Sequence, residues 1–204
     1  MELLEEAVKK VNTEIWEQQE KDASLTGMGT TLTVLWAAEN EMIIGQVGDS
    51  RAYLIREHEM KQVTSDHSMV ADMVRRGVLT EEQAACHPMR NYITRAVGTD
   101  DMLDVDMISI PRKNGDRWLV CSDGLYGQMS RRELEETAKT EDLEEAAGKL
   151  LELALEHGGR DNISFVLIQD EAVPEKAQAT EETEEEPADA VMPENSDQEG
   201  VTAE

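Results

Sequence analysis

Aromatic side chains are scarce in this sequence. Phe, Trp and Tyr make up 3% of the 204 residues, although hydrophobic residues reach 39%. Aliphatic side chains and the 11 Met residues must therefore fill any core. Only two cysteines are present, Cys86 and Cys121, which excludes a disulfide framework. The length suits one domain with an additional segment.

Long apolar runs and a secretory leader are also lacking. No stretch reaches the roughly 18 apolar residues that cross a bilayer. The N-terminal "MELLEEAVKK" is acidic and amphipathic, unlike a signal peptide. Together with the unpaired cysteines, these features predict a cytoplasmic protein without a membrane partner.

Positive charge is in short supply. Against 45 Asp and Glu stand 19 Lys and Arg, which gives a net charge of −26 and argues against nucleic acid as a partner. Residues 170–204 contain 13 acidic residues, one Lys and almost no large apolar side chains. Such a segment buries too little surface to offset its chain entropy. We therefore expect a domain over residues 1–169 and an acidic disordered tail over 170–204.

Several catalytic motifs are absent. "GMGTTL" is not a Walker loop, because no GK[ST] follows at the required distance, and no GxSxG elbow exists. A cysteine phosphatase loop needs an arginine after five intervening residues, but that position is Tyr92 counted from Cys86 and Gly127 counted from Cys121. An enzyme built on this chain would depend on a metal.

Hydrophobic periodicity predicts separate groups of strands and helices. Thr80 with Gln83, and Ser130 with Glu133, have the spacing of capping boxes at helix starts. Strands in runs, with helices apart from them, favour an α+β sandwich over a doubly wound sheet. The expected strands are 32–38, 42–48, 52–57, 102–110, the run in "DRWLVCSDG" and "NISFVLI", and the expected helices are 2–20, 68–76, 80–87, one after Ser130, and 142–157.

Three aspartates lie beside glycine at expected strand ends. They are Asp49 in "QVGDSRAYL", Asp123 in "CSDGLYG" and Asp161 in "GGRDNISFV". Each alone is compatible with a turn or a cap. Jointly they offer the carboxylate oxygens that Mg²⁺ and Mn²⁺ prefer. His67 and His87 lack the close paired spacing of a zinc site, which favours packing or surface roles.

The chain closely resembles the bacterial branch of the metal-dependent serine/threonine protein phosphatases, the PPM or type 2C family. The resemblance covers residues 1–169 and rests on "TGMGTTLTVLWA", "GQVGDSRAYLIR", "MKQVTSDHSMV", "GVLTEEQAACHPMRNYITRAVG", "DRWLVCSDGLYGQMS" and "GGRDNISFVLI", in this order. It implies a four-layer α-β-β-α sandwich of two antiparallel sheets, incomplete at the N-terminal end. It also implies a helical flap insertion over about 64–92 that influences substrate access.

The resemblance also implies the site. Asp123 and Asp161 would bind a first metal, and Asp49 would share a further metal with Asp123. Gly124 and Asn162 would support the metal-binding edge. The family hydrolyses phosphoserine and phosphothreonine with a metal-activated water and no side-chain nucleophile, using two or three Mn²⁺ or Mg²⁺ ions in the complete domain. Ser50 and Arg51 would be structural.

One family motif is not found. The "DGMGGH"-type sequence, which completes the metal pair in the family, does not occur here. We therefore expect a monomer that is weakly active or inactive alone. Its expected partners are phosphorylated proteins and a cognate Ser/Thr kinase. The alternative is a non-catalytic remnant that binds a partner or a single cation.

Overall fold

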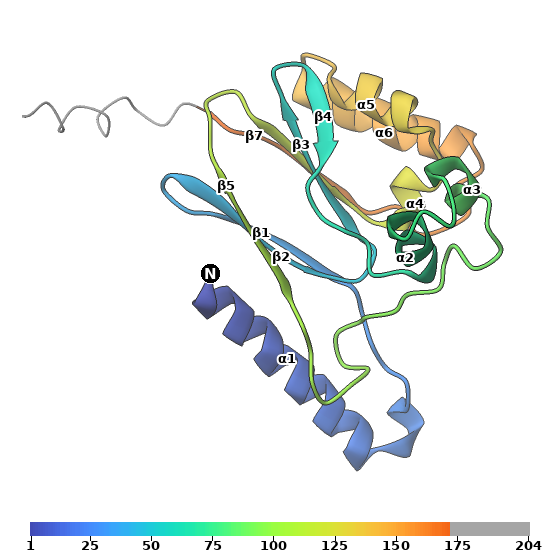
Figure 1. The fold of residues 1–204 in the computed structure, drawn as a ribbon. Coiled ribbons are helices and arrows are strands. Elements are labelled where there is room, and N and C mark those ends of the chain that lie inside the picture. The colour runs from blue at the N-terminus through green and yellow to red at the C-terminus, as the bar shows by residue number, and fades with distance from the viewer. Residues whose placement is uncertain (172–204) are drawn as a thin grey trace, which may run out of the picture. The chain divides into compact units, whose positions relative to one another are not determined.

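Two antiparallel sheets pack face to face in the computed structural model, which describes residues 1–171 (Figure 1). The tail predicted over 170–204 lies outside the described residues from 172 onward. One sheet has the order β1-β2-β5 and the other β4-β3-β6-β7. The strands are β1 (Leu32–Ala37), β2 (Glu41–Val47), β3 (Arg51–Arg56), β4 (Glu59–Gln62), β5 (Asp106–Pro111), β6 (Arg117–Cys121) and β7 (Phe165–Gln169).

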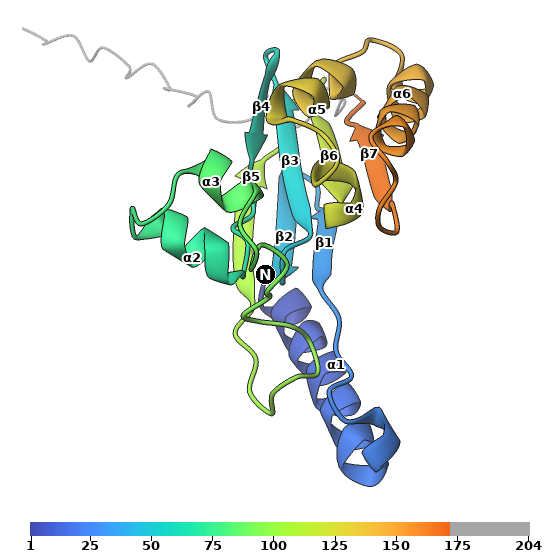
Figure 2. The same cartoon turned by 90° about the vertical axis from the view of Figure 1, so that its right-hand side faces the viewer.

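Helices cover the outer face of each sheet, as Figures 1 and 2 show. The helical segments are α1 (Glu2–Lys21), the short η1 (Ala23–Leu25), α2 (Met69–Arg75), α3 (Glu81–Ala85), α4 (Asp123–Tyr126), α5 (Arg131–Ala138) and α6 (Leu143–Glu156). Val8 of α1 packs with Val47 of β2, whereas Leu134 of α5 and Leu150 of α6 pack with Leu119 of β6. Among residues 1–171, no helix combines the length and hydropathy that a bilayer crossing requires.

The core between the sheets is built from the central strands. Met42 and Ile44 of β2 pack with Leu54 of β3 and Trp118 of β6. Because β2, β3 and β6 are covered on both faces, their sequences are nearly continuous apolar runs rather than alternating ones. The helix–sheet–sheet–helix layering confirms the predicted α+β sandwich.

The segment between β4 and β5 carries α2 and α3 beside the sheets (Figure 2). These helices form the helical insertion expected over about 64–92, and its role as a flap stays a prediction. Both predicted capping boxes are present, at Thr80 with Gln83 in α3 and at Ser130 with Glu133 in α5. These boxes form because each satisfies two backbone donors locally.

Among the boundaries that differ from the sequence prediction, two have a clear cause. The strand expected over 102–110 begins at Asp106, because its pairing with β2 ends at Gln46 opposite Asp106. Past β7, Asp170 is buried and bonded to Arg112. The ordered contacts therefore extend one residue beyond the predicted end of the domain.

Candidate metal centre

The three predicted aspartates lie in connections at one end of the larger sheet. Asp49 lies two residues before β3, Asp123 two residues after β6, and Asp161 four residues before β7. The first residue of β3 pairs with the last of β6, which pairs in turn with the first of β7. Since paired strands are about 4.8 Å apart, the three connections converge.

Asp49 occupies a tight turn between β2 and β3. The preceding Gly48 has a φ of 101°, and a Cβ there would lie 2.4 Å from the Thr31 side chain, so the turn requires glycine. Burial raises the pKa of the half-buried Asp49 carboxyl, and the charges of Asp123 and Asp66 raise it further. The Asp49 turn lies beside the start of α4, because Arg51 pairs with Cys121 and the Tyr126 hydroxyl donates to the Asp49 carbonyl at 2.9 Å.

Asp123 begins α4 directly against the connection that carries Asp161. A Cβ on the buried Gly124 would lie 2.2 Å from the Asn162 carbonyl oxygen, so only glycine permits this approach. The Ser122 hydroxyl donates to the same carbonyl at 3.2 Å. Gly124 and Asn162 therefore hold the end of β6 against the connection that leads to β7, whereas their support of a metal stays a prediction.

The Asp161 carboxylate is engaged locally. Its Oδ1 accepts the Asn162 backbone N–H at 2.7 Å, and the residue is exposed. Within residues 1–171, no three His, Cys, Asp or Glu side chains are grouped closely enough to bind a metal ion. The structure thus places Asp49, Asp123 and Asp161 in three neighbouring connections at one end of the larger sheet, without a complete ligand cluster among residues 1–171.

The donor chemistry of this edge fits a hard divalent cation. Asp49 and Asp123 offer carboxylate oxygens, and a cation bound there would offset the negative charge that raises the pKa of Asp49. Mg²⁺ and Mn²⁺ are coordinated by such oxygens, and Mg²⁺ in particular retains several water ligands. A site with few protein ligands is therefore chemically reasonable.

Arg51 is fully engaged next to this edge. Its Nε and Nη2 donate to Asp66 at 3.0 and 2.7 Å, and its guanidinium stacks 3.7 Å from the centre of the Tyr126 ring. The Tyr126 hydroxyl donates to the Asp49 carbonyl at 2.9 Å. Arg51 is structural, as expected, but Asp66 and Tyr126 were missed. Tyr126 follows Asp123 by three residues within "CSDGLYG", and this short separation could have indicated that it lies beside the candidate site.

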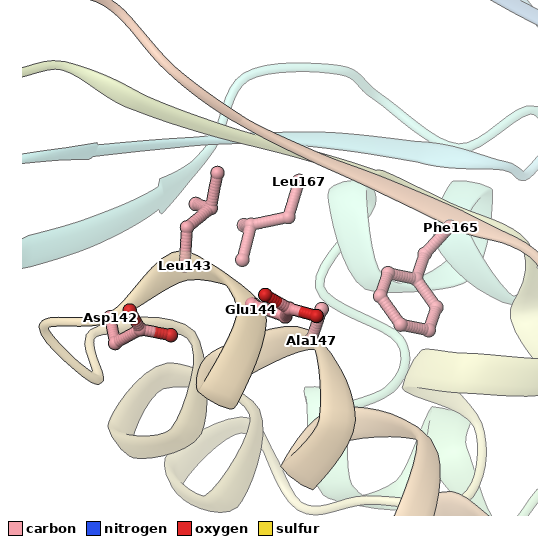
Figure 3. A pocket seen from close by; sticks show the side chains of 6 residues that line it. All are labelled: Asp142, Leu143, Glu144, Ala147, Phe165 and Leu167. Carbon is pink, nitrogen blue, oxygen red and sulfur yellow. The ribbon is translucent and has the colours of Figure 1, made fainter.

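A surface groove of about 430 Å³ lies elsewhere, between α6 and β7 (Figure 3). Leu143, Ala147, Phe165 and Leu167 line it together with two acidic side chains from the start of α6. None of the three aspartates lines it, so the groove is separate from the candidate metal centre.

Known proteins resemble the chain in sequence. The serine/threonine phosphatase stp of Listeria monocytogenes serotype 4b is 38% identical over 167 residues, which cover 81% of this chain and 66% of that protein. The serine/threonine protein phosphatase PstP of Mycobacterium tuberculosis is 39% identical over 164 residues, 80% of this chain and 32% of its own length. The chain thus spans less than two thirds of these relatives.

Solved structures resemble it as well. Serine/threonine phosphatase Stp1 from Staphylococcus aureus matches with a TM-score of 0.80 and 34% identity, covering 84% of this chain and 68% of that one. The catalytic domain of PstP in complex with two manganese ions matches with a TM-score of 0.74 and 36% identity, covering 82% and 69%. The sequence model of protein phosphatase 2C matches residues 1–162. This chain therefore belongs to the protein phosphatase 2C family.

Proposed function

We propose that this chain provides the cation-binding edge of a phosphatase that hydrolyses phosphoserine and phosphothreonine in proteins. Its membership in the family supports the reaction class, and the names of its relatives support serine/threonine specificity. The manganese complex of PstP supports Mn²⁺ or Mg²⁺ as the cofactor. The observation that carries the proposal is the position of Asp49, Asp123 and Asp161 in three connections at the end of the larger sheet, where the strand pairing brings them together.

Each named residue has a role in this proposal. Asp49 and Asp123 hold a shared cation, and Asp161 joins Asp123 once its carboxylate leaves the Asn162 N–H. Gly124 and Asn162 keep the two strand ends in contact. Mn²⁺ or Mg²⁺, when bound, would supply a water of lowered pKa and neutralise charge on the phosphoryl oxygens.

Charge explains why the cation is indispensable. The chain has a net charge of −26, and a phosphorylated protein brings further negative charge to it. Two carboxylates alone would repel that substrate, whereas bound cations reverse the local potential. We propose phosphorylated proteins, and a kinase that phosphorylates them, as partners of a monomer in the cytoplasm.

A second candidate function is a non-catalytic module that binds one cation or a partner. The lack of a three-residue ligand cluster among residues 1–171 favours it. In this case the chain alone binds Mn²⁺ weakly and turns over little or no phosphopeptide.

Hydrolysis of a phosphothreonine peptide with and without Mn²⁺ distinguishes the two functions. A phosphatase shows Mn²⁺-dependent phosphate release that Asp123→Asn lowers by at least about 100-fold, because even outer-shell partners of metal ligands contribute roughly 10- to 100-fold. Asp101→Asn, at an exposed aspartate, is the matched control and should retain full activity. Release that is equal in Asp123→Asn and wild type would refute the proposed site, and no release from wild type would favour the second function.

A further inference from the structure

The connections that carry Asp123 and Asp161 are bonded to each other where they leave the larger sheet. The Ser122 N–H donates to the Ser164 carbonyl at 2.9 Å, and the Ser164 N–H donates to the Ser122 hydroxyl oxygen at 3.2 Å. These bonds continue the pairing of β6 with β7 past the last paired residues. They hold the strand side of both connections.

A further bond joins the same two connections on their helix side. His157, the residue that ends α6, donates its Nδ1–H to the Gln128 carbonyl at 2.8 Å. Since a carbonyl oxygen only accepts, Nδ1 carries the proton in this bond. Gln128 lies five residues after Asp123, and His157 lies four residues before Asp161. The two aspartates therefore lie in a ring of chain that is closed at both ends.

Two consecutive glycines follow His157 and lead to Asp161. Gly158 and Gly159 have φ values of 119° and 48°, which favour glycine. Their N–H groups donate to carbonyls of the last turn of α6, each at 3.0 Å. These bonds keep the turn on the end of its own helix, whereas the bond from His157 attaches it to Gln128 of the other connection.

The start of α5 orients the His157 ring. Its Nε2 lies 3.8 Å from Glu133 Oε1. The other oxygen of this carboxylate accepts the Ser130 N–H at 2.8 Å and the Ser130 hydroxyl at 2.7 Å, so its place is fixed by the capping box. The His157 and Glu133 side chains are 36% and 42% exposed, so water screens their pair. The hydrogen bond to Gln128 is therefore the stronger contact of the ring.

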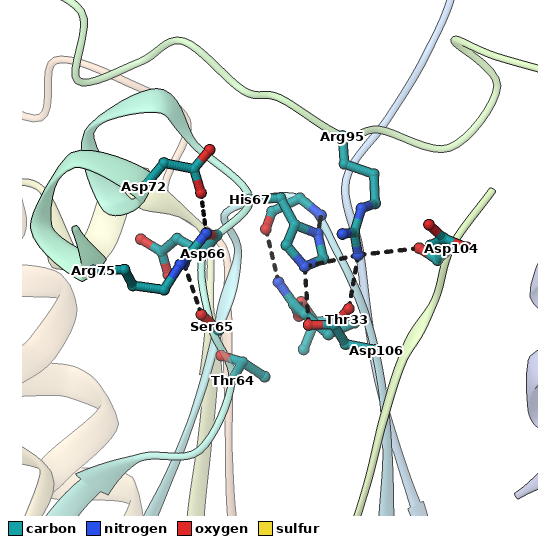
Figure 4. Close-up of polar contacts among 12 residues, drawn as sticks. Thr33, Thr64, Ser65, Asp66, His67, Asp72, Arg75, Arg95, Asp104 and Asp106 are labelled. Atoms are coloured by element: carbon teal, nitrogen blue, oxygen red, sulfur yellow. Dashed lines mark hydrogen bonds and ion pairs between the residues drawn. The ribbon is translucent and has the colours of Figure 1, made fainter.

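Two other histidines are bonded elsewhere. His67 is buried, and its Nε2 lies 3.1 Å from Asp106 Oδ2 (Figure 4). His87 Nδ1 accepts the Met89 N–H at 3.1 Å, within its own turn. Within residues 1–171, neither is hydrogen-bonded to the connection after α4 or to the one after α6. His87 therefore offers a matched histidine for comparison with His157.

We propose that His157 is a positioning residue of the candidate metal centre, which sets the place of Asp161 relative to Asp123 through its bond to Gln128. The inference rests on the proposed function, in which these aspartates bind the cation. Loss of the bond opens the ring on its helix side and lets the two-glycine turn carry Asp161 away from Asp123. The affinity for Mn²⁺ then falls, because part of the binding free energy is used to close the ring again.

Two substitutions at His157 separate the hydrogen bond from the volume of the side chain. In His157→Asn, the amide nitrogen lies near the place of Nδ1 and can donate to the Gln128 carbonyl. His157→Leu has a branched side chain of similar size to Asn but no donor. Glu133→Gln keeps an acceptor for the capping box and removes the charge near Nε2. His87→Leu is the matched control.

Amide hydrogen exchange and Mn²⁺ affinity are measured on the full chain. We expect the Gly158 and Gly159 amides to exchange about 3- to 10-fold faster in His157→Leu, because the end of α6 opens more readily after the loss of one hydrogen bond. The other three variants should exchange at close to the wild-type rate. The Mn²⁺ Kd should rise by about 3- to 10-fold in His157→Leu alone. Unchanged exchange in β6 and β7 verifies that each variant is folded.

Three results would overturn the inference. The first is wild-type exchange at both glycines in His157→Leu. The second is faster exchange with an unchanged Mn²⁺ Kd, because His157 would then only stabilise the end of α6. The third is an equal loss of affinity in His157→Asn and His157→Leu, because the hydrogen bond would then be irrelevant.

A failure of the proposed function is distinguishable from a failure of this inference. If the wild-type chain binds no Mn²⁺ at all, the proposed function fails. The backbone amide NMR shifts of Asp161 and Asn162 still decide whether His157 sets their place. They should change in His157→Leu and stay close to wild type in His157→Asn, and unchanged shifts in His157→Leu would contradict the role of His157.

Discussion

Two glycines at the candidate metal centre leave no room for a side chain. Gly48 lies against Thr31 in a left-handed turn, and Gly124 lies against the Asn162 backbone. The second contact matters more for the site, because the Asn162 backbone belongs to the connection that carries Asp161 and cannot move without moving that aspartate.

Gly124→Ala should therefore disrupt the site. Its Cβ would lie 2.2 Å from the Asn162 carbonyl oxygen, a backbone atom, so the free energy of unfolding should fall by about 1–3 kcal/mol. Gly148→Ala is the control: Gly148 is within α6 with open space around it, and alanine there should stabilise by about 0.4–1 kcal/mol. Urea unfolding measures both, and equal effects of the two substitutions would contradict the close approach.

Ion pairs tie the ends of strands together away from the site. Arg56 of β3 donates to the buried Asp116 before β6, at 2.7 and 2.6 Å. Arg112 donates to Asp170 after β7 at 2.7 and 2.6 Å, and Asp170 is buried. Such two-point bonds between Arg and a carboxylate fix strand ends that sheet pairing alone leaves free.

Asp170→Asn should lower the free energy of unfolding by about 2–3 kcal/mol at pH 7, because it leaves a half-buried guanidinium with a weaker acceptor. The hydrogen bonds from Arg112 hold the pKa of the Asp170 carboxyl below its usual 3.8. The stabilisation is therefore complete above pH 3.8 and is lost as pH falls through the lowered value.

Urea unfolding at pH 7 and at pH values below 3.8 checks the sign. The difference in the free energy of unfolding between wild type and Asp170→Asn should become smaller as the pH is lowered. Glu136→Gln, at an exposed pair with Arg132, is the control and should change stability by less than about 0.5 kcal/mol at any pH. If this difference in the free energy of unfolding became larger at low pH, a stabilising pair of Arg112 and Asp170 would be contradicted.

Local signals predicted most of the elements, but not β4, η1 or α4. The capping boxes at Thr80 and Ser130 could be predicted because the two residues of each box are only three positions apart in the sequence. Contacts between residues that are distant in the sequence could not be predicted in this way. Nothing near His67 in the chain indicates that Asp106, 39 residues later, fixes its ring. The start of the strand at Asp106 likewise depends on where the partner strand β2 stops pairing.

At the candidate site too, some features could be predicted from the sequence and others depend on the fold. The glycine-flanked aspartates were found from sequence, and sheet pairing places their connections at one edge. Their side-chain orientations depend on the fold. Asp161 bonds to the next residue in the chain, whereas the Asp49 carbonyl accepts a hydrogen bond from Tyr126 of α4.

At the scale of the molecule, the sandwich places Asp49, Asp123 and Asp161 in connections at one edge of the larger sheet. A net charge of −26 makes that edge attractive to divalent cations and repulsive to phosphoproteins until cations are bound. Cation binding at Asp49 and Asp123 is therefore the claim on which the phosphatase proposal depends.

Calorimetric titration of Mn²⁺ into the full chain tests this claim most directly. The account predicts saturable binding to the wild type, loss of that binding in the double variant Asp49→Asn and Asp123→Asn, and retention in Asp101→Asn. Binding of equal affinity in the wild type and the double variant would contradict it.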